Sequence, residues 1–200
     1  MVIPALIVGA IVVILLLVVV SLYNRFVRSR NRVDNAWAQV DVQLRRRYDL
    51  IPNLVESVKG YASHERETFE RVTQARTAGV QARTVEEQAQ AENMLTAALR
   101  QLFAVSEAYP ELRANENFQQ LQAQLEQTEG QIATARQIYN DSVLIYNNGI
   151  QQFPGNLIAG TFGFAPRTYL EIEEASRGPV DVDFRAMPGR EAPPDSEPAT

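Results

Sequence analysis

Few residues in this chain could do chemistry, and the single histidine is the first to consider. His64 and Glu65 begin like the His-Glu-x-x-His motif of zinc proteases, but Thr68 stands where the second histidine is needed. The Glu-x-x-His element of di-iron bundles is missing too, because Tyr61 occupies its glutamate position. The chain also has no cysteine, no Gly-x-Ser-x-Gly turn and no glycine-rich phosphate loop. The sequence therefore predicts no catalytic residue, no metal ligand and no cofactor, and a protein that is not an enzyme.

A different kind of site follows one face of the segment around Pro52. Charged and polar residues recur there at steps of three and four, beside an apolar stripe, at Asp41, Arg45, Asp49, Pro52, Glu56, Lys59 and Ser63. One interpretation is a solvated surface with ion pairs worth about 0.3–0.5 kcal/mol each. The other is a docking face whose alternating charges fix the register of a partner. The candidate docking residues are Asp41, Arg45, Asp49, Pro52, Glu56 and Lys59. The partner, another protein or a second copy of the chain, stays unidentified.

Two polar features within the expected helices need partners. Pro52 removes the hydrogen bond to the carbonyl of Tyr48, which costs about 3 kcal/mol inside a helix. We expect a guanidinium of the adjacent Arg45–Arg47 run to satisfy that carbonyl. The pair Tyr139-Asn140 recurs seven residues later as Tyr146-Asn147. Tyrosines at core positions need partners for their hydroxyls. We expect polar contacts across the bundle to the helix of Pro52, and the alternative is a ligand site.

The elements that position these residues are long helices. An apolar stripe with helical spacing predicts one helix over residues 33–76, with a weak point at Pro52 and Gly60. Thr84 and Glu87 form a capping box that opens a second helix, which Pro110 ends. A third helix is expected to start at Asn115 or Glu116 and to be closed by Phe153-Pro154-Gly155, and short helical turns are expected over 156–175. The fold class is therefore all-α, an elongated antiparallel bundle with coiled-coil-like seams. The core is expected to include Leu44, Ile51, Leu125 and Tyr139.

The passage AWAQVDVQLRRRYDLIPNLVESVKGYASHE, residues 36–65, resembles the signature of the LemA family. The resemblance is long and contiguous, and it implies the same helical bundle. It also implies a bacterial membrane protein whose role is undefined. Some relatives take part in building magnetosome membranes, but a shared motif of this kind defines a fold and not an activity.

The N-terminus predicts a membrane anchor. Residues 2–22 carry no charged residue, and as a helix they span about 30 Å, the thickness of a bilayer core. A cleaved signal peptide is disfavoured, because no Lys or Arg precedes the run and no Ala-x-Ala site follows it. The flanking cations lie after the span, at Arg25, Arg28, Arg30 and Arg32. The positive-inside rule then places the N-terminus outside and the rest in the cytoplasm.

Charge and composition limit the possible partners and suggest the domain boundaries. A net charge of −5 argues against a nucleic-acid partner. We expect an anchor over 1–23, a bundle over 24–176 and a disordered, acidic and proline-rich tail over 177–200. The function that fits best is a single-pass, non-enzymatic scaffold or adaptor in the bacterial cell membrane. The alternatives are an auxiliary subunit of a membrane protease or transporter, and a small-molecule or ion sensor with its site inside the bundle, near Tyr139, Tyr146 and residues 45–49.

Overall fold

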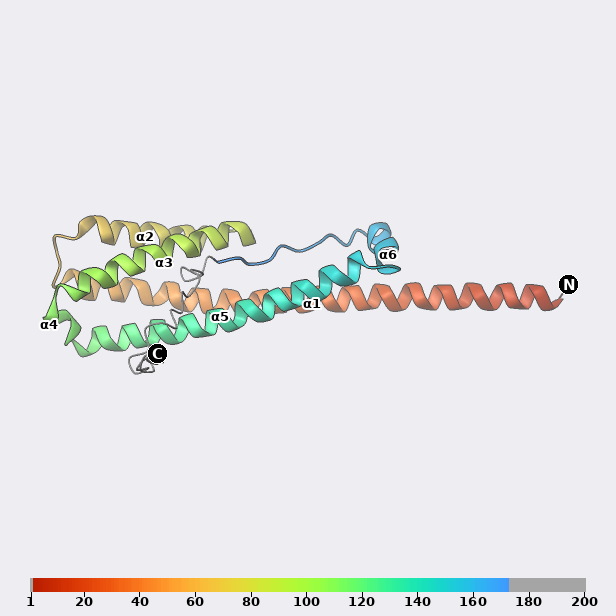
Figure 1. Ribbon diagram of the computed structural model, residues 1–200, viewed down its shortest axis with the longest axis horizontal. Helices are drawn as coiled ribbons and strands as arrows, with labels where there is room; N and C mark the ends of the chain where they lie inside the picture. The colour runs from red at the N-terminus through yellow and green to blue at the C-terminus, as the bar shows by residue number, and fades with distance from the viewer. Residues whose placement is uncertain (1, 173–200) are drawn as a thin grey trace, which may run out of the picture.

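A computed structural model describes residues 2–172 of the chain as an all-α structure with no strand in that part. Its helices, in chain order, are α1 (Val2–Lys59), α2 (Arg66–Gln81), α3 (Val85–Glu107), α4 (Pro110–Arg113), α5 (Glu116–Gln151) and α6 (Gly155–Phe162). Figure 1 shows them as an elongated bundle from which the N-terminal part of α1 projects. The predicted fold class is confirmed. The predicted tail over 177–200 lies outside the described residues.

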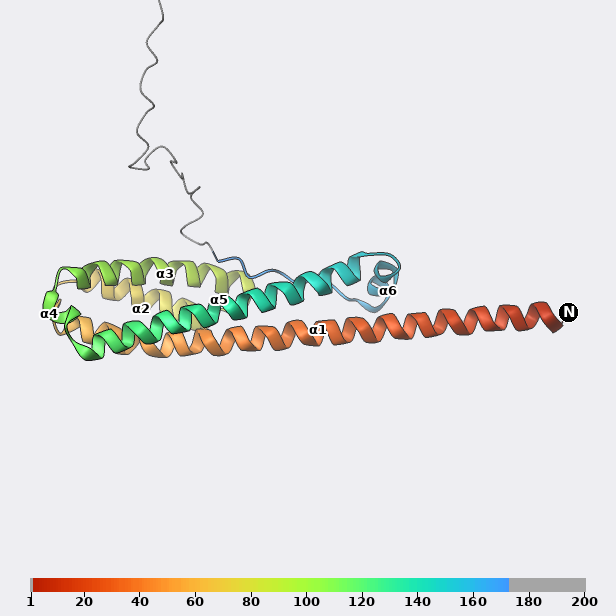
Figure 2. The same ribbon diagram turned by 60° about the horizontal axis from the view of Figure 1, so that its bottom comes forward.

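The helix α1 joins the apolar N-terminus to the bundle without a break. Its 58 residues span about 87 Å at the usual helical rise. The apolar window near its N-terminus is entirely exposed, and α1 is the helix of the described part that is long and apolar enough to cross a membrane. In Figure 2 residues 2–22 extend past the other helices. The second part of α1 is therefore held at a fixed angle to this apolar segment.

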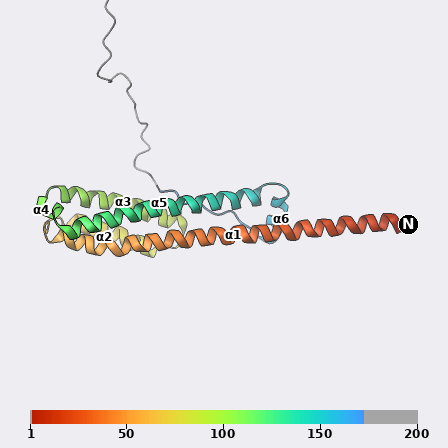
Figure 3. The ribbon, with the colours of Figure 1, turned by 90° about the horizontal axis from the view of Figure 1, so that it is seen from below.

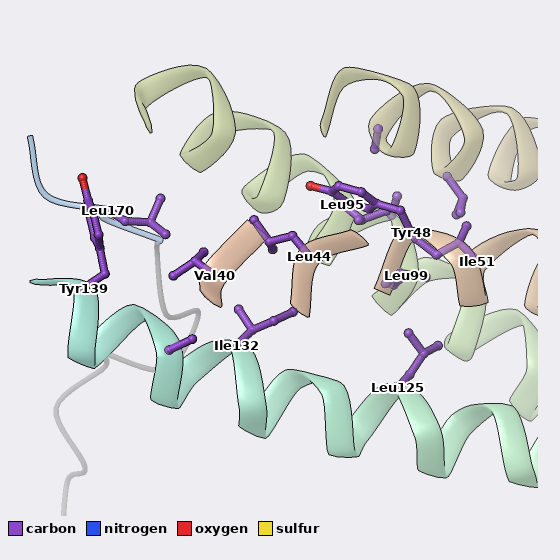
Figure 4. Packing of buried hydrophobic residues seen from close by; sticks show 14 of the residues in the cluster. Val40, Leu44, Tyr48, Ile51, Leu95, Leu99, Leu125, Ile132, Tyr139 and Leu170 are labelled. Atoms are coloured by element: carbon purple, nitrogen blue, oxygen red, sulfur yellow. The ribbon is translucent and has the colours of Figure 1, made fainter. Parts of the chain in front are cut away.

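The bundle is built on an antiparallel pair, because α5 runs back along the second part of α1 (Figure 3). The helices α2 and α3 form a hairpin on the same length of α1, and α4 connects α3 to α5. Figure 4 shows apolar side chains of α1, α3 and α5 pointing into the space between these helices. The predicted core residues are all buried there, with exposed fractions of 4% or less: Leu44, Ile51, Leu125 and Tyr139.

The prediction of one helix over residues 33–76 is wrong, because the chain reverses after Lys59. Gly60 begins a turn, and α2 starts again at Arg66. The apolar spacing continued across the turn because Ala62 is buried at the end of the core while Phe69 packs from α2. The buried residues of α1 and α2 therefore follow the same apolar spacing that a single continuous helix would show.

The predicted starts of the second and third helices are confirmed. Thr84 caps α3 in a reciprocal capping box with Glu87, with Oγ1 accepting from the Glu87 amide at 3.1 Å. Asn115 caps α5 by accepting from the Phe118 amide. Of the short turns expected over 156–175, the described part, which ends at residue 172, contains one helix, α6. After Gly163 the chain runs as an extended segment, residues 164–172, which we call the strap (Figure 1).

Pro52 shapes the contact between α1 and α2. The Tyr48 carbonyl, which Pro52 leaves without its helical donor, accepts a hydrogen bond from Nε of Arg76 in α2 at 2.8 Å. A guanidinium was predicted here, but from the neighbouring arginines of α1, and that assignment is wrong. On the same side, the ring of Tyr48 lies against the backbone of Gly79, where an added Cβ would come within 2.6 Å of the Tyr48 Cζ. Pro52 thus leaves the Tyr48 carbonyl free to accept a hydrogen bond, and Arg76 of α2 donates that bond.

This arrangement predicts a coupling between Pro52 and Arg76. Replacing Arg76 by alanine leaves a part-buried carbonyl without a partner, which should lower the free energy of unfolding by about 1–3 kcal/mol. In the Pro52→Ala background the new amide of residue 52 can donate to Tyr48, so the same change should cost under about 1 kcal/mol. Urea unfolding of the four proteins in detergent, followed by circular dichroism, measures the coupling.

The matched control is Arg71→Ala, which removes an exposed arginine of α2. Its effect should be small and equal in both backgrounds. An equal loss for Arg76→Ala with and without Pro52 would contradict the account.

Candidate functional site

The predicted docking residues lie along the solvent side of α1. Five of them are exposed and Asp41 is partly exposed. Two ion pairs run within this charged stripe, Arg45 to Asp41 at 2.8 Å and Lys59 to Glu56 at 3.7 Å. Pairs this exposed contribute at most about 1 kcal/mol. The structure therefore places all six residues on one accessible face, and their use by a partner stays a prediction.

A buried ion network lies on the opposite side of the same helix, and sequence reasoning missed it. Arg47 is 3% exposed and its guanidinium contacts Glu92 of α3, which is fully buried, at 2.6 Å. It also contacts Glu129 of α5 at 2.6 Å and donates to the hydroxyl of Thr96 at 3.2 Å. One guanidinium thus ties together α1, α3 and α5.

Neighbouring polar groups complete the partners of Glu92. Its Oε1 accepts a hydrogen bond from the Tyr48 hydroxyl, which in turn accepts one from Nε2 of Gln88 at 2.6 Å. Burial, followed by the negative charge of Glu92, raises the pKa of Tyr48, so this phenol stays a proton donor. Burial also raises the pKa of Glu129, against the opposing effect of Arg47. Nε of Arg47 is buried without a hydrogen-bond partner, but the remaining contacts of the guanidinium join three helices, which suits a structural lock.

A helical-wheel analysis could have found this network. Arg47 lies at the phase of the apolar stripe, between Leu44 and Tyr48, and Glu92 lies at the equivalent phase of α3, between Ala91 and Leu95. Opposite charges at core phase on two helices indicate a buried pair, because an unpaired buried charge is very costly.

The repeated tyrosine–asparagine pairs of α5 bind the strap and do not contact α1 through hydrogen bonds as predicted. Asn147 accepts from the Arg167 amide and donates to the Arg167 carbonyl, both at 2.9 Å. Asn140 does the same with Leu170, at 2.9 and 3.2 Å. Each asparagine therefore reads both main-chain groups of one strap residue.

The tyrosines extend the same pattern to the flanking carbonyls. Tyr146 donates to the Ala165 carbonyl at 3.0 Å, and Tyr139 donates to the Thr168 carbonyl at 2.8 Å. Burial is the main cause that raises the pKa of both phenols, which keeps them protonated donors. Tyr139 also stacks on Trp37 of α1, with ring centroids 5.2 Å apart.

The rise per residue explains why side chains seven residues apart in α5 bind residues three apart in the strap. Seven residues advance a helix by about 10.5 Å, and three residues advance an extended chain by about 10 Å. Each copy of the seven-residue repeat in α5 therefore meets an equivalent peptide group of the strap. The side chain of Leu170 is 1% exposed, so the strap also closes part of the core (Figure 4).

Four of the grooves on the described part of the chain do not involve the tyrosines expected at a ligand site. Four grooves of about 350 to about 800 Å³ are open to solvent on the described part of the chain. Tyr139 and Tyr146 line none of these four. Within residues 2–172 no group of three or more His, Cys, Asp or Glu residues is placed to hold a metal ion.

The membrane-flanking arginines follow the apolar segment on α1. Arg25, Arg28, Arg30 and Arg32 are exposed. The guanidinium of Arg30 lies 5.6 Å from the ring centroid of Phe164, the first residue of the strap. Within reach of the expected bilayer surface, these cations are available to anionic groups.

The asparagine contacts predict that the strap can be released without unfolding the helices. Asn147→Ala orphans the amide and carbonyl of Arg167, and we expect the amides of Arg167 and Leu170 to exchange at least tenfold faster, a loss of about 1–3 kcal/mol. Hydrogen exchange read by mass spectrometry measures this. Asn148→Ala, which changes the exposed neighbour, is the control. Equal protection of the strap in both variants would contradict the assignment.

Comparison with known proteins places the chain in a family. The chain is 27% identical over 184 residues to "Magnetosome protein MamQ 2" of Paramagnetospirillum magneticum, covering 79% of this chain and 68% of that protein. It is 26% identical over 164 residues to "Protein LemA" of Metamycoplasma hominis, covering 80% and 73%. The LemA family profile matches residues 36–184. With its exposed apolar segment on α1, the chain resembles a membrane-anchored protein, and it belongs to the LemA family.

Proposed function

We propose that this protein is a membrane-anchored scaffold or adaptor without enzymatic activity, which binds a protein partner through the charged stripe of α1. The observation that carries the proposal is the continuity of α1. The stripe from Asp41 to Lys59 covers about 27 Å of the same helix that begins in the apolar segment. A partner bound there would be held at a set distance and angle from the membrane.

The energetics of the stripe support docking over a merely solvated surface. Its ion pairs are exposed and add little to stability, so the fold does not require alternating charges at these positions. The stability of the bundle comes from the opposite side of α1, where Arg47 and the apolar residues are buried. An ordered charge pattern on a face that the fold leaves free is typical of a surface that selects a partner and its register.

The orientation follows from the arginines after the span. Arg25, Arg28, Arg30 and Arg32 favour a cytoplasmic location for the bundle and an external N-terminus. A membrane protease or transporter bound to the stripe would make the chain its auxiliary subunit. The sensor alternative is weaker, because the hydroxyls of Tyr139 and Tyr146 already bind the strap.

Site-directed photocrosslinking tests the proposal. A photoreactive amino acid at Asp49, in the middle of the stripe, should give a discrete adduct in the membranes of expressing cells. The double change Arg45→Glu and Lys59→Glu should reduce that adduct severalfold, with the larger loss at low salt, because exposed charges are screened by ions. The unfolding free energy should change by less than about 1 kcal/mol.

Two controls make the result specific. Arg71→Glu breaks a comparable exposed pair on α2, away from the stripe, and should leave the adduct unchanged. The mass of the adduct distinguishes a second copy of the chain from another protein. An adduct that survives the double reversal would contradict docking at the stripe. A cysteine at Asp49 that an impermeant maleimide labels in intact spheroplasts would contradict the orientation.

A further inference from the structure

The turn after α5 and the helix α6 form an apolar tip beside the first turns of α1 that follow the apolar segment. Residues 142–166 contain no charged side chain. Three large apolar residues of this tip are exposed, Phe153 at 80%, Leu157 at 62% and Phe162 at 51%. Apolar side chains that cluster on a surface mark an interaction site when they lie together.

The tip lies against α1 directly after the apolar segment. Tyr23 directly follows the apolar run that ends at Leu22, and the ring centroid of Phe162 lies 5.1 Å from that of Tyr23. The ring centroid of Phe164 lies 5.7 Å from that of Tyr23 and 5.5 Å from that of Phe26. An aromatic cluster is thus built at the level where a membrane-spanning α1 would leave the hydrocarbon core. Figure 1 shows α6 at the end of the bundle that faces the N-terminal part of α1.

We propose that α6 and the turn before it are a second membrane contact, an interfacial foot that lies in the headgroup region beside the span. Phe153, Leu157 and Phe162 enter the boundary between headgroups and acyl chains, where aromatic and aliphatic side chains are favoured. Arg25 and Arg28, exposed on α1 near this level, meet the lipid phosphates. The inference rests on the proposed anchoring of residues 2–22.

The foot would fix the tilt of the bundle against the membrane. The span alone leaves α1 free to tilt and rotate, whereas an interfacial contact beside the span restrains both. The strap follows α6 directly, so the contacts of Asn140 and Asn147 hold the foot to α5 at a fixed place.

The absence of native cysteine allows a direct test by single-site spin labelling. Full-length Leu157→Cys and Phe153→Cys, each carrying a nitroxide, are reconstituted in phosphatidylcholine–phosphatidylglycerol vesicles. Collision rates with oxygen, which partitions into the bilayer, and with a water-soluble nickel chelate report the depth. Leu15→Cys serves as the control inside the span and Val80→Cys, exposed on α2, as the control in water. Unchanged circular dichroism verifies each fold.

We expect both foot labels to give oxygen-to-nickel collision ratios between those of the two controls, at headgroup depth. Foot labels as accessible to nickel as Val80 would overturn the proposal. Labels shielded from both reagents would overturn it too, in favour of a protein contact such as a second copy. A nickel-accessible label at Leu15 would instead show that the anchoring itself fails.

Discussion

The buried guanidinium of Arg47 lies within the apolar interface of the helices. The arrangement of the bundle depends on the anionic partners that this charge needs. Removing a guanidinium from water costs several kcal/mol, which only close, well-bonded anions can offset. Glu92 of α3 and Glu129 of α5 supply them from two different helices, each at 2.6 Å. The two ion pairs therefore form together only when α1, α3 and α5 pack in one particular register.

Buried polar contacts of this kind fix the register between helices, which apolar stripes alone do not determine. A long stripe of similar side chains still packs when one helix slides past another by a turn or a heptad, so burial alone does not set the register. The Arg47 network sets it at one level, and Arg76 on the Tyr48 carbonyl sets the position of α2. The asparagine contacts to the strap set it near the membrane end. The result is a rod in which the charged stripe and the foot keep constant positions relative to the apolar segment.

The parts of this fold that are local in sequence were predictable from it. The caps at Thr84 and Asn115, the helical stripes and the apolar N-terminus each depend on residues a few positions apart. The reversal at Gly60 was missed because the turn preserved the apolar spacing. The helical phases of Arg47 and Glu92 indicate a buried pair, but the strap partners of the tyrosine–asparagine pairs could not be assigned, because they depend on which distant segments the folded chain brings together. The side-chain types indicated that partners were needed but not where they lie.

The Arg47–Glu92 pair offers the most direct measurement of this account. Urea unfolding of Arg47→Met, Glu92→Gln and the double variant, in detergent and on the full chain, gives their coupling free energy. Arg47→Met leaves Glu92 buried without a cation and should cost about 3–5 kcal/mol, whereas Glu92→Gln leaves Arg47 with Glu129 alone and should cost less, though more than about 1 kcal/mol. The double variant removes both charges and should lose clearly less than the sum of the two single losses. Additive losses, or single losses below about 1 kcal/mol, would contradict the claim that this pair sets the arrangement of the bundle.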